Sequence, residues 1–132
     1  MHDLARKQEL EIGGAQKYFK PLEKAIYKDD FWSCTIWVAK VIEQTVGFVA
    51  VHPHELTYIY VHPDFQGNGI GFALAKKALL NLERPVTLDV FVENEKAKSL
   101  YRKLGFVSQE VKWQQWDLMD PKKYSDEKMI LN

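Results

Sequence analysis

One segment limits the fold more than any other: a glycine-rich stretch, 66–71, between a β-like run and a helix-like run. The run before it, Glu55–Val61, is rich in β-branched and aromatic residues, which predicts a strand. A strand, a tight turn and a helix in this order aim unpaired backbone N–H groups at one point, where an anion such as a phosphate binds. The run after the glycines has the apolar spacing of a helix, in Leu74, Ala75, Ala78, Leu79 and Leu82.

The glycines also admit a second interpretation. Glycine lacks the Cβ atom that keeps a phosphate away from the backbone, but the same lack lets a helix pack closely on a strand. Three alternate glycines, Gly67, Gly69 and Gly71, exceed what packing requires. No Gly-Lys-Ser/Thr follows, so the turn is not a Walker loop, and Phe72 occupies the place of the third glycine of the dinucleotide fingerprint. We therefore expect an anion site of another kind.

The rest of the chain predicts a mixed α/β fold, in which an antiparallel meander passes into one β-α-β crossover. Residues 1–132 are expected to form a single domain, because their number suits one. The crossover implies that its two strands pair in parallel. The expected helices are one capped by Asp3 and stopped by Gly13–Gly14, one around Phe19, Leu22 and Ile26, one over 73–82, and one capped by Glu93 or Asn94 and stopped by Gly105; the expected strands are 34–41, 45–51, 55–61, 86–92, 106–113 and a short 128–131.

Composition argues against several classes of function. With 46% hydrophobic residues the chain can bury a core, and its 18 basic residues cancel its 18 acidic ones, which weakens any model of broad binding to nucleic acid or to an anionic membrane. Cys34 is the single cysteine, and the histidines have no recognisable ligand spacing, so we expect neither a disulfide nor a bound metal. The first residues lack the apolar segment of a signal peptide, and we expect a cytoplasmic protein.

Two motifs resemble those of one known family. The pattern Gln-x-x-Gly-x-Gly, at Gln66, Gly69 and Gly71, resembles the acetyl-CoA pyrophosphate loop of the GCN5-related N-acetyltransferases, the GNAT family. The segment 94–106 resembles the family's Asn-x-x-Ala-x-x-Leu-Tyr-x-x-x-Gly-Phe signature, and it begins 23 residues after Gly71. With the predicted strands around them, the two motifs extend the resemblance over roughly Phe31 to Trp113.

The resemblance implies an acetyl-CoA-dependent N-acetyltransferase in which an amine attacks the thioester directly, without a metal and without an acyl-enzyme on Cys34. It also implies that Tyr101 donates a proton to the departing CoA sulfur, and that Asn94 either caps its helix or contacts the pantetheine arm. The resemblance further implies that the strands that end at Val61 and start at Val86 splay apart, so that pantetheine pairs like a strand. The implied cofactor-binding residues are Ile59, Tyr60, Val61, His62, Gln66, Gly67, Asn68, Gly69, Ile70, Gly71, Asn94 and Tyr101.

The acceptor amine raises the question of a base. A lysine-like amine with a pKa of about 10.4 must lose a proton before it attacks, which costs roughly 4.6 kcal/mol at pH 7. The candidates are two carboxylates, Glu55 near the start of its strand and Asp89 in the middle of the second crossover strand, and either acts directly or through water. Glu55 is equally well explained as a solvated strand end. Asp89, between Leu88 and Val90, needs a partner or a wet cleft.

The chain departs from the family pattern in two places. Asn68 stands where the family usually has a cation, so one phosphate contact is missing. A helix is predicted where the family has its first strand, and the sheet edge is then covered by the amino-terminal helix, the carboxyl-terminal residues or a second copy in a homodimer. Arg102 and Lys103 are better explained as a solvated helix end than as contacts to the CoA 3′-phosphate.

Two interpretations of the function therefore follow from the sequence. In the first, the chain acetylates a primary amine, either on a small molecule or on a peptide. In the second, it is a CoA-binding sensor or regulatory module, which keeps the cofactor loop but has lost the acceptor pocket with the first strand. Turnover of acetyl-CoA with an amine distinguishes the two.

Overall fold

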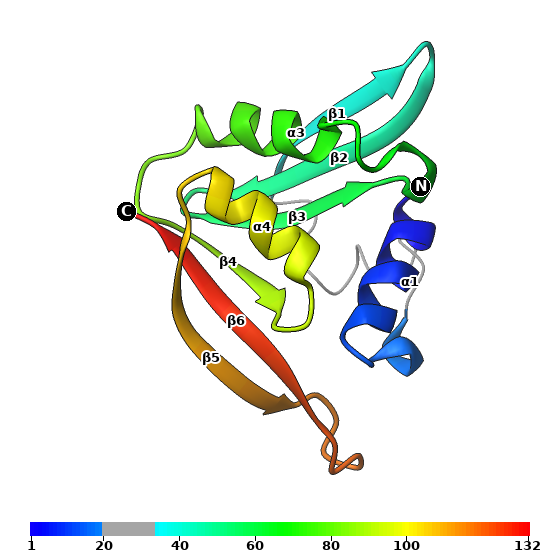
Figure 1. Ribbon diagram of the computed structural model, residues 1–132, viewed down its shortest axis with the longest axis vertical. Helices are drawn as coiled ribbons and strands as arrows, with labels where there is room; N and C mark the ends of the chain where they lie inside the picture. The colour runs from blue at the N-terminus through cyan, green and yellow to red at the C-terminus, as the bar shows by residue number, and fades with distance from the viewer. Residues whose placement is uncertain (20–33) are drawn as a thin grey trace.

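The computed structural model of the chain describes residues 1–19 and 34–132 (Figure 1). The helix predicted around Phe19, Leu22 and Ile26 falls mostly outside these residues. The first helix ends at Gly13 as predicted, but its N-cap is Met1 rather than Asp3. The described elements are α1 His2–Ile12, η1 Gln16–Tyr18, β1 Thr35–Val41, β2 Gln44–His52, β3 Glu55–Val61, η3 Pro63–Phe65, α3 Ile70–Leu79, β4 Val86–Phe91, α4 Glu95–Lys103, β5 Val107–Gln115 and β6 Lys123–Leu131.

The six strands of the described chain form one mixed sheet in the order β1-β2-β3-β4-β6-β5. β1, β2 and β3 pair antiparallel and β4 pairs parallel with β3, which confirms the meander and the crossover. The predicted short strand 128–131 is wrong in length, because β6 has nine residues and lies between β4 and β5. The first half of β6 is polar in sequence, so it does not have the pattern of a buried strand. Its Ser125 and Glu127 are nevertheless buried, because they pair with Glu93 and Lys98.

β3 and β4 separate soon after they meet. Their register contains one residue pair, Glu55 with Thr87. Next to that pair the Thr87 N–H donates to the His54 carbonyl at 2.9 Å. Beyond it the two strands diverge, as the resemblance implied, and α4 and α1 lie at the opening between them (Figure 1).

A β-bulge in β3 accompanies this divergence. Val51 of β2 lies opposite Leu56, whereas its neighbour Ala50 lies opposite Tyr58. Thr57 is therefore an extra residue in β3 without a partner position on β2. A bulge of this kind bends its strand and increases the local twist. The bulge lies directly after the one residue pair that joins β3 to β4.

Helices cover both faces of the sheet. Val90 of β4 joins the main core with α3 and α4, and its neighbour Phe91 points to the other face. On that second face Leu10 of α1 packs near Phe91, and Ala5 packs near Phe48. α1 therefore covers the face opposite to α3 and α4, and β1 and β5 are the two edge strands of the described sheet.

A close contact holds the end of α1 against β4. A Cβ atom on Gly13 would lie 2.5 Å from two ring carbons of Phe91, whose side chain is almost fully buried. No side chain larger than a hydrogen fits there unless the ring moves. Glycine at this position therefore sets how closely α1 approaches the sheet.

We expect Gly13→Ala to lower the free energy of unfolding by about 1–3 kcal/mol, because the added methyl group overpacks a buried ring. Glu11→Ala, a change at an exposed position of α1 two residues before Gly13, is the control. Its free energy of unfolding should stay within about 0.5 kcal/mol of the parent. Denaturant-induced unfolding measures both changes. A Gly13→Ala variant as stable as the parent would show that α1 is not held by this contact.

Candidate functional site

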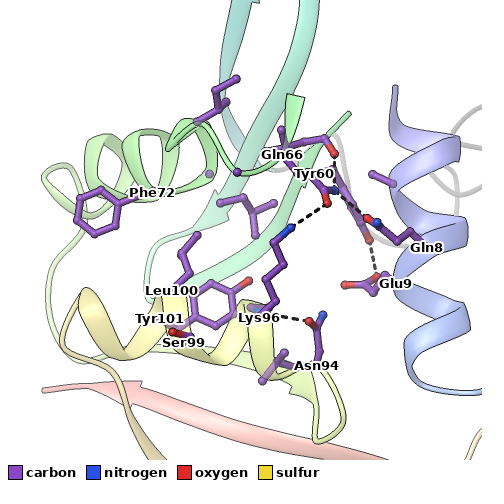
Figure 2. Close-up of a pocket in the computed structure, with 18 of the residues that line it drawn as sticks. Gln8, Glu9, Tyr60, Gln66, Phe72, Asn94, Lys96, Ser99, Leu100 and Tyr101 are labelled. Carbon is purple, nitrogen blue, oxygen red and sulfur yellow. Dashed lines mark hydrogen bonds between the residues drawn. The ribbon is translucent and has the colours of Figure 1, made fainter. Parts of the chain in front are cut away.

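A cavity of about 670 Å³ opens where β3 and β4 diverge (Figure 2). Its walls come from α1, β3, β4, α4 and the glycine turn with the start of α3. A volume of this size suits a small-molecule or cofactor ligand. The predicted site residues that line it are Ile59, Tyr60, Val61, Gln66, Gly67, Gly69, Ile70, Gly71, Asp89, Asn94 and Tyr101.

Three predicted site residues lie outside the cavity lining: His62, Asn68 and Glu55. The side chains of the first two build the turn, since His62 Nδ1 accepts from the Asp64 N–H at 3.0 Å and Asn68 Nδ2 donates to the Phe65 carbonyl at 3.2 Å. Glu55 begins β3, where the two strands are still paired. These three residues therefore lie next to the cavity without lining it.

The glycines of the turn divide into two kinds. Gly67 has a φ of 83° and Gly69 a φ of 78°, and a Cβ atom on either would meet no atom within 4 Å. These two glycines serve the left-handed backbone and not close packing. A Cβ atom on Gly71 would lie 3.3 Å from Leu100, so Gly71 does allow α3 to approach α4. The packing interpretation thus holds for one glycine of the three.

The start of α3 presents unpaired donors to the cavity. Gly69 is the N-cap, and within the described chain no side chain caps this end. The Ala73 N–H donates to the Gly69 carbonyl at 3.0 Å, as the first turn requires. The N–H groups of Ile70, Gly71 and Phe72 precede that bond and have no intrahelical acceptor. With the helix dipole they attract an anion.

The Gln66 side chain connects this turn to two other walls of the cavity. Its Nε2 donates to the Val61 carbonyl at 3.0 Å and to Gln8 Oε1 of α1 at 2.7 Å. Its Oε1 lies 3.5 Å from the Lys96 ammonium of α4. Figure 2 shows these three contacts meeting at the mouth of the cavity.

The backbone of β3 presents alternate residues to the opening. The His62 N–H donates to the Val46 carbonyl of β2 at 2.7 Å. Hydrogen-bonded positions alternate along an antiparallel pair, so the backbone groups of Tyr60 and His62 face β2. Those of Ile59 and Val61 face the opening toward β4. Of the four residues predicted here, these two carry backbone groups on the side of the opening. The Val61 carbonyl already accepts from Gln66 Nε2 at 3.0 Å, so its N–H is the group that remains for a ligand.

Tyr101 of α4 reaches into the cavity from the main core. Its ring packs edge-on against Phe106 with the centroids 6.0 Å apart, and the side chain is 7% exposed. Its hydroxyl has no hydrogen-bond partner among the described residues and points into the cavity (Figure 2). Burial, and next the charge of Glu9, raise the pKa of Tyr101 well above its ordinary value. The phenol therefore keeps its proton at any physiological pH.

Two carboxylates line the cavity, Asp89 of β4 and Glu9 of α1. Burial, and next the charge of Glu55, raise the pKa of Asp89, against the opposing charge of Lys128. Glu9 accepts the Tyr60 hydroxyl at 3.1 Å and forms an ion pair with Arg6. Glu9 was not among the predicted site residues. In the sequence, its position beside the buried Leu10 is the one sign that it lies near the sheet.

Asn94 and Lys98 fix the start of α4. Asn94 Oδ1 accepts from the Ala97 N–H at 3.2 Å, so Asn94 caps the helix and also lines the cavity. The buried Lys98 ammonium lies 2.9 Å from Glu95 and 3.4 Å from Glu127 of β6. The cap and this ion pair set the position from which Tyr101 enters the cavity.

The described residues give two further findings on partners. In the ranges 1–19 and 34–132, no three His, Cys, Asp or Glu side chains gather as a metal site. No helix of that part is long and apolar enough to cross a membrane. Cys34 Sγ lies 3.7 Å from His52 Nε2, and neither residue lines the cavity.

Asp126 lies on the α1 face of the sheet, among other acidic side chains. Asp126 of β6 is opposite Phe91 in register. Burial, and next the charges of Asp89, Glu9 and Glu93, raise the pKa of Asp126 to about 6. A raised carboxyl pKa means that the folded chain holds this proton after the unfolded chain has lost it. Asp126 therefore makes the fold less stable as the pH rises from about 4 to 6.

Comparisons with known proteins agree with this geometry. A family model described as "Acetyltransferase (GNAT) domain" matches residues 32–108. An uncharacterized N-acetyltransferase of Methanocaldococcus jannaschii is 38% identical over 112 residues, which are 74% of this chain and 47% of that protein. YjaB, a peptidyl-lysine N-acetyltransferase of Escherichia coli, is 33% identical over 72 residues, which are 54% of this chain and 48% of that protein. The chain thus spans about half the length of the curated relatives it matches.

A solved structure shows the same fold. The spermidine N-acetyltransferase from Vibrio cholerae, in complex with CoA and spermine, matches with a TM-score of 0.67 at 21% identity. The match covers 98% of this chain and 85% of that one. The predicted mixed α/β fold of the GNAT type is confirmed.

The raised pKa of Asp126 yields a prediction about stability and pH. We expect Asp126→Asn to raise the free energy of unfolding relative to the parent by about 1 kcal/mol more at pH 7.5 than at pH 4.5, after allowance for partial solvent screening. Chemical denaturation at both pH values measures this difference. The exposed Glu43→Gln in the β1–β2 turn is the control and should show no such change between the two pH values. A pH-independent effect of Asp126→Asn would contradict the burial of this carboxyl.

Proposed function

Because the chain belongs to the GNAT family of acetyltransferases, we propose that it transfers an acetyl group from acetyl-CoA to a primary amine. One observation carries the proposal: a single cavity joins the unpaired N–H groups at the start of α3 to the Tyr101 hydroxyl and the Asp89 carboxyl. A phosphate-bearing carrier fits the first end, and acyl transfer needs groups like those at the second. We assign this activity to residues 1–132 as one domain.

In this proposal acetyl-CoA lies along the opening between β3 and β4. Its diphosphate accepts hydrogen bonds from the N–H groups of Ile70 and Gly71 at the positive end of α3. Its pantetheine arm pairs with the backbone of Ile59 and Val61, which face the opening. The thioester then lies near Tyr101. The Vibrio cholerae enzyme of the same fold is described with CoA and spermine, which supports a CoA carrier and an amine acceptor.

The chemistry follows from the two ends of the reacting group. Asp89 takes a proton from the amine, directly or through water, and the amine nitrogen attacks the thioester carbonyl carbon in a ternary complex. The C–S bond then breaks, and the sulfur leaves with a proton from Tyr101. The nitrogen of the tetrahedral intermediate loses its second proton, which returns through water to the Tyr101 phenolate, while the first proton passes from Asp89 to solvent. A thiol has a pKa of about 8.5, so this proton assists departure without being indispensable. Cys34 lies outside the cavity and forms no acyl-enzyme.

The raised pKa of Asp89 suits a base. A general base works best when its pKa approaches the working pH, and burial with the charge of Glu55 moves Asp89 in that direction. Asp89 must be ionised to act, so the rate should rise with pH through its raised pKa. Glu55 acts on this reaction through Asp89 and does not touch the cavity.

The acceptor is proposed as a primary amine of either class that the sequence allowed. YjaB is named for peptidyl-lysine and the Vibrio cholerae enzyme for spermidine, and both acceptors carry a primary amine on a flexible chain. A screen of acetyl-CoA consumption with polyamines, small amines and lysine peptides tests the proposal.

The rival function is a CoA-binding sensor without turnover. It is favoured by the closure of the cavity by α1, where Gln8 bonds to Gln66 and Glu9 bonds to Tyr60. A sensor binds acetyl-CoA but does not consume it, whichever amine of the screen is added. Turnover with any amine class decides for the enzyme.

We expect Tyr101→Phe to lower the chemistry-limited turnover by about 10²-fold, because the departing sulfur loses its proton donor. Acetyl-CoA affinity should stay close to that of the parent. The control is Tyr124→Phe, a buried tyrosine outside the cavity, which should keep its turnover. Single-turnover kinetics across the pH range measures these effects, and an unchanged rate for Tyr101→Phe would remove the acid role.

Substitutions of the two carboxylates should have different effects on kcat/KM. Asp89→Asn should lower kcat/KM by about 10²-fold and abolish the acid limb of its pH profile. Glu55→Gln should keep the maximal rate but move that limb to lower pH, because a negative charge that raises the pKa of Asp89 is gone. The profile of kcat/KM between pH 5 and 9 measures both. If Glu55→Gln abolishes activity and Asp89→Asn does not, the base is Glu55.

A further inference from the structure

The glycine turn binds a highly charged group without a cation of its own. Segment 61–72 contains no lysine or arginine, and Asn68 stands at the position where the resemblance leads one to expect a positive charge. Backbone N–H groups supply hydrogen bonds but only a partial charge. A CoA diphosphate on this turn therefore needs a counter-charge from another part of the cavity wall.

Lys96 of α4 lies opposite the turn. Its side chain extends from the first turn of α4 across the cavity mouth, and its ammonium reaches Gln66 Oε1 at 3.5 Å (Figure 2). It lines the same cavity as Gly67 and Gly69. The 3.5 Å contact to a neutral amide oxygen is at the limit of a hydrogen bond. A stronger acceptor at the turn would displace it.

Lys96 has no ionic partner of its own in the described chain. Glu95, its neighbour on α4, is engaged by Lys98 at 2.9 Å and by Arg102 at 3.7 Å. Among residues 1–19 and 34–132 no carboxylate oxygen lies within 4.0 Å of the Lys96 ammonium. A lysine in the first turn of a helix also lies at the unfavourable, positive end of the helix dipole. Helix stability therefore does not explain this lysine.

We propose that Lys96 binds the diphosphate of the CoA carrier from the wall opposite the glycine turn and supplies the charge that Asn68 lacks. The inference rests on the proposed function. A lysine suits this place because its ammonium is a compact charge on a flexible stem, able to leave Gln66 and follow a phosphate oxygen. Lys103 also lines the cavity, but it follows seven residues later, roughly 10 Å along α4 from Lys96.

The test compares the binding of CoA and of 3′-dephospho-CoA by calorimetry. We expect Lys96→Gln to weaken both ligands by about fivefold, because both carry the diphosphate. Lys96→Arg should keep most of the affinity. Lys77→Gln, an exposed lysine of α3 outside the cavity, is the matched control and should bind like the parent. Thermal unfolding without ligand confirms that each variant is folded.

Each other outcome overturns the inference in a recognisable way. Unchanged affinity of Lys96→Gln for both ligands means that Lys96 does not touch the diphosphate. A loss with CoA that disappears with 3′-dephospho-CoA places Lys96 at the 3′-phosphate instead. Failure of the parent chain to bind either ligand is a different result, because it overturns the proposed function itself.

Discussion

The divergence of β3 and β4 is the constraint on which the rest of the structure depends. Paired throughout, the two strands would satisfy each other's backbone groups and leave no opening in the sheet. They touch at Glu55 and Thr87, and the bulge at Thr57 follows directly. The backbone of Ile59 and Val61 is left facing a cavity instead of a strand. The Val61 carbonyl is satisfied by Gln66 Nε2. For the other backbone groups on this side, we propose a ligand that pairs like a strand, because unpaired backbone groups are costly when buried.

The other parts of the site are arranged around that opening. The glycine turn directs the start of α3 to one end of it, and α4 brings Tyr101 to the other, held by the Asn94 cap and the Lys98 ion pair. α1 closes the remaining side from the opposite face of the sheet. The groups proposed to bind and to react therefore come from two strands, β3 and β4, and two helices, α3 and α4, and they meet in one cavity.

Local patterns made much of this predictable. Glu55–Val61 is rich in β-branched and aromatic residues and is bounded by turn residues, so the predicted strand and the observed one coincide. Asn94 is a cap in both, because capping depends on neighbours within one turn. The helix predicted over 73–82 begins at Ile70, since its first turn consists of glycine and apolar residues that a periodicity pattern reads as turn.

Features that depend on distant neighbours were not predictable. The first half of β6 is polar in sequence and was therefore not predicted as a strand. Its Glu127 can be buried because Lys98, which belongs to another element, pairs with it. Glu9 and Lys96 belong to ordinary charged helix surfaces until the tertiary fold turns them toward the cavity. The sequence kept both Glu55 and Asp89 as candidate bases, with Asp89 the harder to explain without a function, and the three-dimensional arrangement puts Asp89 but not Glu55 in the cavity wall.

We propose that backbone amides at the junction of sheet and helix hold the phosphates of a CoA carrier while β3 pairs with its arm. A titration with acetyl-CoA, followed by the NMR shifts of the backbone amides, measures this binding residue by residue. We expect the largest changes at Ile70 and Gly71, further changes at Ile59 and Val61, and little change at Tyr60. Saturable changes confined to other segments, with these amides unmoved, would contradict it.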